Sequence, residues 1–359
     1  MHIPDGYLSP QTCAVMYGAA APFWMTAARR VRTIVKTRFV PLLGLGAAYC
    51  FLVMMFNVPI PDGTTAHALG GVLVAVLLGP WAAVMAVTVA LAIQALFFGD
   101  GGVLVFGANC FNMAVVMPFV GYGTYRLLAR HQALTSRRRA LAAGIGAYVG
   151  INAAALCAAI EFGLQPELFY KTSAAGAHVP LYSPFHLSQS IPAMLGAHLL
   201  VAGVVELALT AGVIAYLQRA NVPLLRINHP AVPEADAQLT PVEPSPRVCG
   251  LLLGLAAMLA LVPLGLVATG GAFGENTPAQ LDLRKYGLHA VPAGLEHYSD
   301  FWSHSLLPGY DFKQGSHPSI GYYTSALVGT LLILAVGFGT FRFVARVRQR
   351  RTVQIPARR

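Results

Sequence analysis

The chain opens with two residues that can together chelate a metal ion. Because His2 follows Met1 directly, the Met1 α-amino group, the His2 backbone nitrogen and His2 Nδ1 can close fused rings on one ion. A fourth nitrogen would complete a square plane, a geometry that Ni(II) and Cu(II) favour. Pro4 stiffens the following chain, and Asp5-Gly6 indicates a turn. The alternative is an unstructured terminus, which is common at chain ends.

The composition is that of a membrane protein. The chain has 359 residues, of which 56% are hydrophobic and only 11% charged, about half the charged fraction usual in soluble proteins. Long uncharged runs recur from end to end and predict an all-α integral membrane protein, a polytopic helical bundle. The N-terminus lacks the basic region and small-residue cleavage site of a signal peptide, so we expect Met1 to be retained.

Nine apolar runs predict about nine transmembrane helices. The predicted spans are residues 12–28, 38–56, a short glycine-rich third span ending at 78, and then 81–98, 103–125, 140–162, 187–217, 248–269 and 321–344. The count of nine depends on the third span, which is the shortest.

The distribution of basic residues predicts the orientation. With the N-terminus outside, the cytoplasmic segments 29–38, 126–139, 219–247 and 342–359 hold 20 of the 24 Lys and Arg residues. Cytoplasmic loops are enriched in these residues, so the predicted topology is N-out and C-in. The net charge of +10 is thereby explained by topology, and no nucleic-acid partner is expected.

The same map divides the chain into four parts. Residues 1–218 form a predicted transmembrane domain that holds the metal-binding residues. A proline-containing stretch, 219–247, predicts a flexible cytoplasmic linker. Residues 248–345 form an accessory unit of two helices with a long external loop at 270–319, and residues 346–359 form a basic cytoplasmic tail.

His67 is a candidate fourth ligand. It follows the turn at 57–63 on the face that also carries Met1 and His2 in the predicted topology. Histidine is the commonest metal-binding side chain. The alternative is a histidine at a helix start whose ring is bonded to a nearby carbonyl.

Several polar residues within the spans are candidates for supporting roles. Asn109 and Asn112 are three apart and share a helical face, and with Gln94 they could orient the N-terminal loop or His67. The alternative is a hydrogen bond to a neighbouring helix. Glu206 lies inside a span and is a functional candidate; contact with a partner subunit and pairing with His198 both remain open. His186 and His198 are twelve apart and form a poor ligand pair.

Motifs of several enzyme classes are missing from the sequence. The chain has no P-loop, so it does not hydrolyse ATP itself, and it has no HExxH or GxSxG motif. We therefore expect a protein that is not an enzyme, and active transport would need energy from another polypeptide.

Three strings occur in order within residues 1–126: MHIPDGYLSP at 1–10, GTTAHALGG at 63–71 with LGPW at 78–81, and GDGG, GAN, FNMAVV and PFVGY within 99–122. They resemble the CbiM/NikM family, the substrate-capturing membrane components of energy-coupling-factor transporters for cobalt and nickel. Residues 140–217 match this family mainly in hydrophobic pattern.

The second unit is similar to the CbiN/NikN-like accessory domain of these systems. The similarity rests on GE at 274–275, PAGLE at 292–296, PGYD at 308–311 and SALVG at 325–329. The family usually has Asp where Ala293 stands, and we assign the 270–319 loop no ligand role.

The resemblance implies a function and a set of partners. The ligands would be the Met1 amine, the His2 backbone nitrogen and imidazole, and the His67 imidazole. Ni²⁺ or Co²⁺ would be the transported substrate, taken up through a bacterial inner membrane with a transmembrane coupling subunit and two cytoplasmic ATPases. An all-nitrogen square plane favours nickel. The alternatives are cobalt uptake for cobalamin synthesis, a membrane-embedded metalloenzyme and a passive metal channel.

Overall fold

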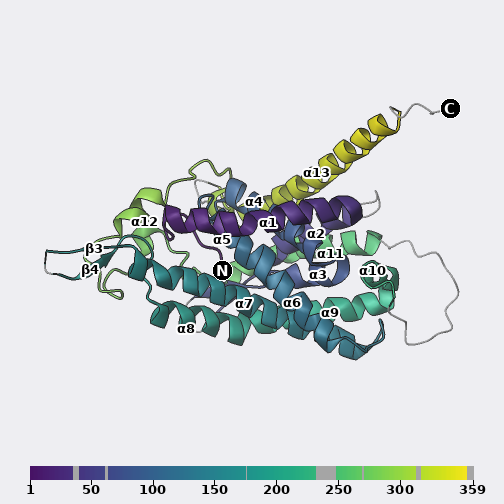
Figure 1. Cartoon of the computed structure of the whole chain (residues 1–359), viewed down its shortest axis with the longest axis horizontal. Coiled ribbons are helices and arrows are strands. Elements are labelled where there is room, and N and C mark those ends of the chain that lie inside the picture. The colour runs from purple at the N-terminus through teal and green to yellow at the C-terminus, as the bar shows by residue number, and fades with distance from the viewer. Residues whose placement is uncertain are drawn as a thin grey trace.

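The computed structural model describes residues 1–34, 40–60, 64–174, 176–231, 248–268, 271–312 and 317–353. It is a bundle of helices with the N-terminus inside it (Figure 1). The first unit contains α1 (Pro10–Ile34), α2 (Val40–Met54), α3 (Gly71–Leu78), α4 (Pro80–Ile93), η1 (Gln94–Phe98), α5 (Phe106–Asn109), η2 (Cys110–Val116), α6 (Met117–Leu128), α7 (Arg137–Leu168), α8 (Leu187–Ala197), η3 (His198–Ala202), α9 (Gly203–Ala220) and α10 (Val222–Arg226).

The second unit is smaller and packs against the first. It contains α11 (Val248–Leu261), η4 (Val262–Val267), η5 (Pro278–Gln280), α12 (Ala293–Tyr298), η6 (Pro308–Tyr310) and α13 (Pro318–Val353). Both of its long helices, α11 and α13, pack on α2. The loop between η4 and α13 lies beside the first unit, where α12 is close to the start of α1 (Figure 1).

Five helical segments in the described part of the chain are long and apolar enough to cross a membrane: Pro80–Phe98, Arg137–Leu168, Leu187–Ala220, Cys249–Val267 and Pro318–Gly337. Each coincides with a predicted span. The helical nature and the membrane class expected from the sequence are therefore confirmed. The full count of nine crossings and their orientation stay predictions.

The third predicted span is shorter than expected. Its helix, α3, has eight residues and is about 12 Å long, whereas a bilayer core is about 30 Å thick. The residues before it form β2 (Thr65–His67), which pairs antiparallel with β1 (Asn57–Pro59) so that Asn57 faces His67. A second hairpin joins β3 (Tyr170–Thr172) and β4 (His178–Pro180). Neither hairpin is predicted from the sequence, because three-residue strands leave no alternating pattern long enough to detect.

In the described part of the chain, three π-helical segments interrupt the long helices, and each begins at or beside a polar residue in the core. These segments are η1, which starts at Gln94, η2, which follows Asn109, and η3, which starts at His198. A π turn hydrogen-bonds from i to i+5, so it changes which side chains share a face, and such turns are frequent at functional sites.

The first part of the predicted linker is helical and packed. α10 begins just after α9 ends, and its Leu224 and Leu225 are buried. Asn228 then donates to the Ala75 carbonyl, with 3.2 Å between the two atoms. The remainder of the linker, 232–247, and the end of the basic tail, 354–359, lie outside the described residues.

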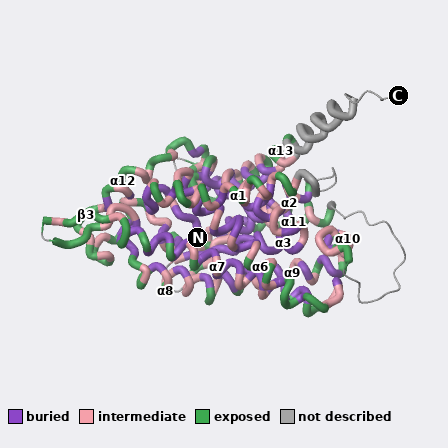
Figure 2. The backbone as a smooth tube through the Cα atoms, viewed as in Figure 1, coloured by how far each residue is buried: buried purple, intermediate pink, exposed green. Residues whose placement is uncertain are grey.

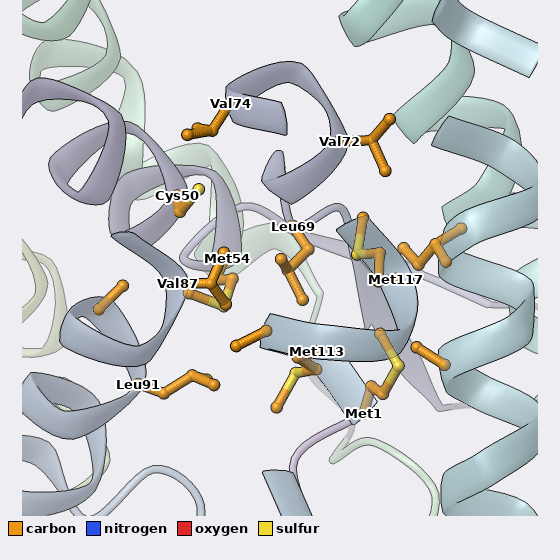
Figure 3. Packing of buried hydrophobic residues seen from close by; sticks show 14 of the residues in the cluster. Met1, Cys50, Met54, Leu69, Val72, Val74, Val87, Leu91, Met113 and Met117 are labelled. Atoms are coloured by element: carbon orange, nitrogen blue, oxygen red, sulfur yellow. The ribbon is translucent and has the colours of Figure 1, made fainter. Parts of the chain in front are cut away.

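Buried residues concentrate in the centre of the bundle (Figure 2). One large cluster contains residues of both units, and the side chain of Met1 belongs to it together with Leu69, Met113 and Met117 (Figure 3). The first residue of the chain is therefore part of the hydrophobic core, and the alternative of an unstructured terminus is wrong.

Candidate metal centre

The N-terminal tripeptide is enclosed. Met1, His2 and Ile3 are each 3% exposed or less. Asn109 holds Ile3 at both backbone groups: its Oδ1 accepts from Ile3 N at 2.8 Å and its Nδ2 donates to Ile3 O at 3.0 Å. This paired contact fixes the backbone directly after His2. The supporting role of Asn109 in metal binding stays a prediction.

Asp5 fixes the next part of the same loop. Its carboxylate accepts hydrogen bonds from Val103 N at 3.0 Å and Val105 N at 3.1 Å. Burial raises the pKa of this carboxyl, and the backbone donors oppose that rise. Gly102 lies against Asp5 and donates its N–H to the Ile3 carbonyl at 3.0 Å. The GDGG stretch thus receives the N-terminal loop.

Gln94 and Asp100 face the ring of His2. His2 Nε2 is 3.2 Å from Gln94 Oε1, and His2 Nδ1 is 3.4 Å from Asp100 Oδ1. Because an amide oxygen only accepts, His2 Nε2 carries the hydrogen in this contact. A neutral His2 ring then has its lone pair on Nδ1, the nitrogen that the chelate needs. Gln94 therefore has a position suited to orienting a ligand.

The ring of His67 lies beside that of His2. The two ring centroids are 5.2 Å apart, and His67 is 5% exposed. His67 Nδ1 is 3.0 Å from the Ala68 carbonyl oxygen, so it carries the hydrogen, while Nε2 is buried with no hydrogen-bond partner in the described structure. The contact with a nearby carbonyl, one of the two alternatives for His67, is present. It uses Nδ1 and leaves Nε2 available for a ligand role.

The surroundings keep His67 neutral, the state in which histidine binds metals. Burial lowers its pKa well below the usual value, and the positive charge of the Met1 ammonium acts in the same direction. An unpartnered buried nitrogen is uncommon in proteins. Here its lone pair is free to bind a cation.

Glu275 of the accessory unit contacts the N-terminal residues. The Met1 ammonium donates to Glu275 Oε1 at 2.8 Å. Burial alone would raise the pKa of Glu275, but the Met1 ammonium and the His2 backbone N–H lower it, and the net direction is downward. The 270–319 loop, which was assigned no ligand role, thus contacts two of the three donor groups expected in residues 1–2.

A cavity of about 360 Å³ lies between His2, His67 and Glu275. Residues of the first unit line it together with residues of the accessory loop, including His2, His67, Asp100, Glu275 and Tyr310. No group of three or more His, Cys, Asp or Glu side chains suited to a metal occurs among the described residues.

Asn112 does not share the surroundings of Asn109. Its Nδ2 donates to Glu161 Oε2 at 2.9 Å, a contact with α7. The π turn that begins after Asn109 accounts for this, because residues three apart on it no longer share one face. The alternative of a hydrogen bond to a neighbouring helix describes Asn112 correctly, and the expected role beside the N-terminal loop does not.

Glu206 has a role that the sequence left open. Its carboxylate accepts from Leu69 N at 2.7 Å and from Gly70 N at 3.0 Å. It therefore fixes the backbone two and three residues after His67, at the start of α3. His198 makes a different contact, from Nδ1 to the Met194 carbonyl oxygen at 2.7 Å, so the suggested pairing of the two side chains is wrong.

Asp100, Glu275 and Tyr310 are the site residues that sequence reasoning missed. Asp100 and Glu275 stand inside strings that carry the family resemblance, and their charge at these positions was the only signal. Tyr310 also stands in such a string, PGYD at 308–311, but an aromatic residue in a loop gives no chemical signal of its own.

Fold and site together define a helical membrane protein with a pocket beside its N-terminus, lined by His2, His67 and carboxylates. Residues 2–224 match the family CbiM, described as "Cobalt uptake substrate-specific transmembrane region", and residues 247–346 match the PDGLE domain. The chain belongs to the CbiM family, fused to a PDGLE domain.

Relatives and solved structures agree with this assignment. The chain is 47% identical to the "Fused nickel transport protein NikMN" of Rhodobacter capsulatus, over 93% of this chain and 95% of that protein. It is 46% identical to the "Probable fused nickel transport protein LarMN" of Lactiplantibacillus plantarum, with the same coverage. A crystal structure of a truncated transition metal transporter is 55% identical and covers 61% of this chain and 99% of its own, with a TM-score of 0.56.

Proposed function

We propose that this protein captures Ni²⁺ outside the membrane and delivers it inward as the substrate-specific component of an ATP-driven uptake complex. The ligands would be the Met1 amine, the His2 backbone nitrogen, His2 Nδ1 and His67 Nε2. The observation that carries the proposal is the buried, unpartnered Nε2 of His67, 5.2 Å from the His2 ring between centroids. The names of two fused relatives, both nickel transport proteins, support nickel over cobalt.

Two of the proposed donor nitrogens carry protons that metal binding would displace. The Met1 amine is an ammonium paired with Glu275, and the His2 backbone nitrogen still carries its hydrogen. Metal ligands must be deprotonated, so binding releases protons. Because Glu275 faces both donors, it is placed to keep a hydrogen bond to the amine once the ion pair is gone.

The distribution of Lys and Arg supports the topology proposed next, and membership of the CbiM family supports a transporter of several subunits. We propose an N-out, C-in topology in a bacterial inner membrane, with a transmembrane coupling subunit and two cytoplasmic ATPases as partners. In this topology the pocket faces the outside, and the segments rich in Lys and Arg face the partners and the anionic lipid of the inner leaflet.

The test is a metal titration of purified protein with a native N-terminus against a variant with one Gly inserted before Met1. The insertion moves the amine out of reach of the chelate, so we expect the native protein to bind one Ni²⁺ and the insertion variant to lose that binding. One Gly added after Arg359 is the matched control. Equal binding by all three forms would remove Met1 from the ligand set and overturn the proposal.

A further inference from the structure

Tyr310 of the accessory unit enters the first unit beside the metal pocket. It is 9% exposed, and its ring stacks on Phe98 with 5.0 Å between centroids. Tyr310 is also the one residue other than glycine in the described part of the chain with a positive φ, 65°, a conformation that L-residues with side chains disfavour. Its carbonyl accepts from Ser325 Oγ at 3.0 Å. The surrounding structure thus holds Tyr310 in a specific and unusual placement.

The Tyr310 hydroxyl joins the two groups that face His2. It donates to Asp100 Oδ2 and accepts from Gln94 Nε2, the latter at 2.9 Å. Asp100 and Gln94 in turn present oxygens to the two nitrogens of the His2 ring, at 3.4 and 3.2 Å. One hydroxyl from the accessory unit therefore orders both neighbours of this ring.

The orientation of the Gln94 amide decides whether His2 Nε2 donates a hydrogen or accepts one. With its NH₂ group held by Tyr310 and Asp100, Gln94 turns its oxygen to His2 Nε2. A flipped amide would place NH₂ there, so Nε2 would have to accept and the hydrogen would move to Nδ1. The lone pair of Nδ1 would then be lost to the chelate.

We propose that Tyr310 is a positioning residue through which the accessory unit sets the His2 ring for metal binding. The proposal rests on the proposed function, because it takes His2 Nδ1 as a ligand. Tyr310 itself does not touch the ion. It acts through Gln94 and Asp100, as the outer partners of metal-binding histidines do.

The test compares Tyr310→Phe with Tyr322→Phe in the full chain with a native N-terminus. Phe at 310 keeps the stacked ring and removes only the hydroxyl. Tyr322 is the matched control, because its buried hydroxyl also crosses from the accessory unit to the first unit. It donates to the Met55 carbonyl at 2.5 Å, and in the described structure no hydrogen bond joins it to Gln94 or Asp100.

We expect Tyr310→Phe to weaken Ni²⁺ binding by about 10- to 100-fold, the usual effect of losing an outer partner of a metal ligand. Its Ni²⁺ absorption bands should also differ from those of the wild type, since the ligand field changes with the His2 ring. Tyr322→Phe should keep the wild-type affinity and spectrum. Wild-type affinity in Tyr310→Phe would overturn the inference.

Gln94→Met tests the same step without changing Tyr310, should Tyr310→Phe fail to fold. It removes the acceptor for His2 Nε2 at similar side-chain volume, and we expect weakened binding to which Tyr310→Phe adds little in the double variant. Additive losses would mean that Tyr310 does not act through Gln94. If the variant with Gly inserted before Met1 binds Ni²⁺ as tightly as the wild type, the proposed function fails. If that variant loses binding but Gln94→Met binds normally, only the role of Tyr310 is overturned.

Discussion

At the scale of single residues, His67 is the side chain on which the metal site most depends. Its Nδ1–H is directed to the Ala68 carbonyl, and its buried Nε2 has no partner in the described structure. We expect His67→Ala to weaken Ni²⁺ binding by more than the ~10- to 100-fold typical of an outer-shell change, because it removes a ligand.

The measurement is a Ni²⁺ titration of purified His67→Ala beside His186→Ala. His186 is a suitable control, because its exposed ring bonds to Glu167 at 2.8 Å and does not line the cavity. Loss of binding in the control as well would indicate a general defect, and unchanged binding in His67→Ala would exclude His67 as a ligand.

Residue types and spacing predicted several members of the candidate site. Met1, His2 and His67 lie together as expected, and Gln94 and Asn109 contact them or the adjoining backbone. Glu275 and Tyr310 could not be predicted, since they come from more than 200 residues away along the chain and no local pattern indicates such contacts. Their ligand and positioning roles stay proposals.

At the scale of elements, the lengths of the apolar runs predicted the helices. The positions of the polar groups depend on π turns and on a hairpin that interrupt the regular helices. Span lengths follow from composition because the bilayer thickness fixes them. The π turn after Asn109 and the short hairpin before α3 leave no pattern in the composition. The π turn separates Asn112 from Asn109, and the hairpin places His67. Asn112 was predicted wrongly for this reason.

The loop at Gly101-Gly102 is the element that receives the N-terminus. A Cβ on Gly102 would collide with the Asp5 carboxylate and backbone, so we expect Gly102→Ala to displace the N-terminal loop and to weaken Ni²⁺ binding at least tenfold, the lower range for loss of support to a metal ligand. Gly123→Ala is the control, because a Cβ there meets no atom within 4 Å.

Both variants can be followed by thermal unfolding and Ni²⁺ titration in detergent. Gly102→Ala should unfold at a lower temperature and bind less metal, whereas Gly123→Ala should match the wild type or be slightly more stable, as Ala favours a helix interior. Wild-type metal affinity in Gly102→Ala would show that the contact between the N-terminal loop and Gly101-Gly102 does not matter for binding.

At the scale of the whole molecule, the two units share one core and one pocket. The accessory loop donates from Trp302 Nε1 to the Leu96 carbonyl at 2.9 Å and from Leu307 N to the Phe97 carbonyl at 3.1 Å. Tyr7 of the first unit donates in return to the Asn276 carbonyl at 2.8 Å. Within a membrane, helix association relies on packing and hydrogen bonds. Here the hydrogen bonds join the accessory loop to the first unit, while α11 and α13 pack on α2.

The covalent connection between the units should therefore be dispensable for metal binding. We expect fragments 1–231 and 248–359, expressed together as separate chains, to purify as one complex that binds Ni²⁺ like the intact protein. Fragment 1–231 alone should bind more weakly, because it lacks Glu275 opposite the Met1 amine and Tyr310 behind Gln94. Size-exclusion chromatography in detergent and a Ni²⁺ titration measure both effects. Separate elution of the two fragments would show that the shared core does not hold the units together, and equal affinity of fragment 1–231 would show that the accessory unit contributes nothing to the pocket at equilibrium.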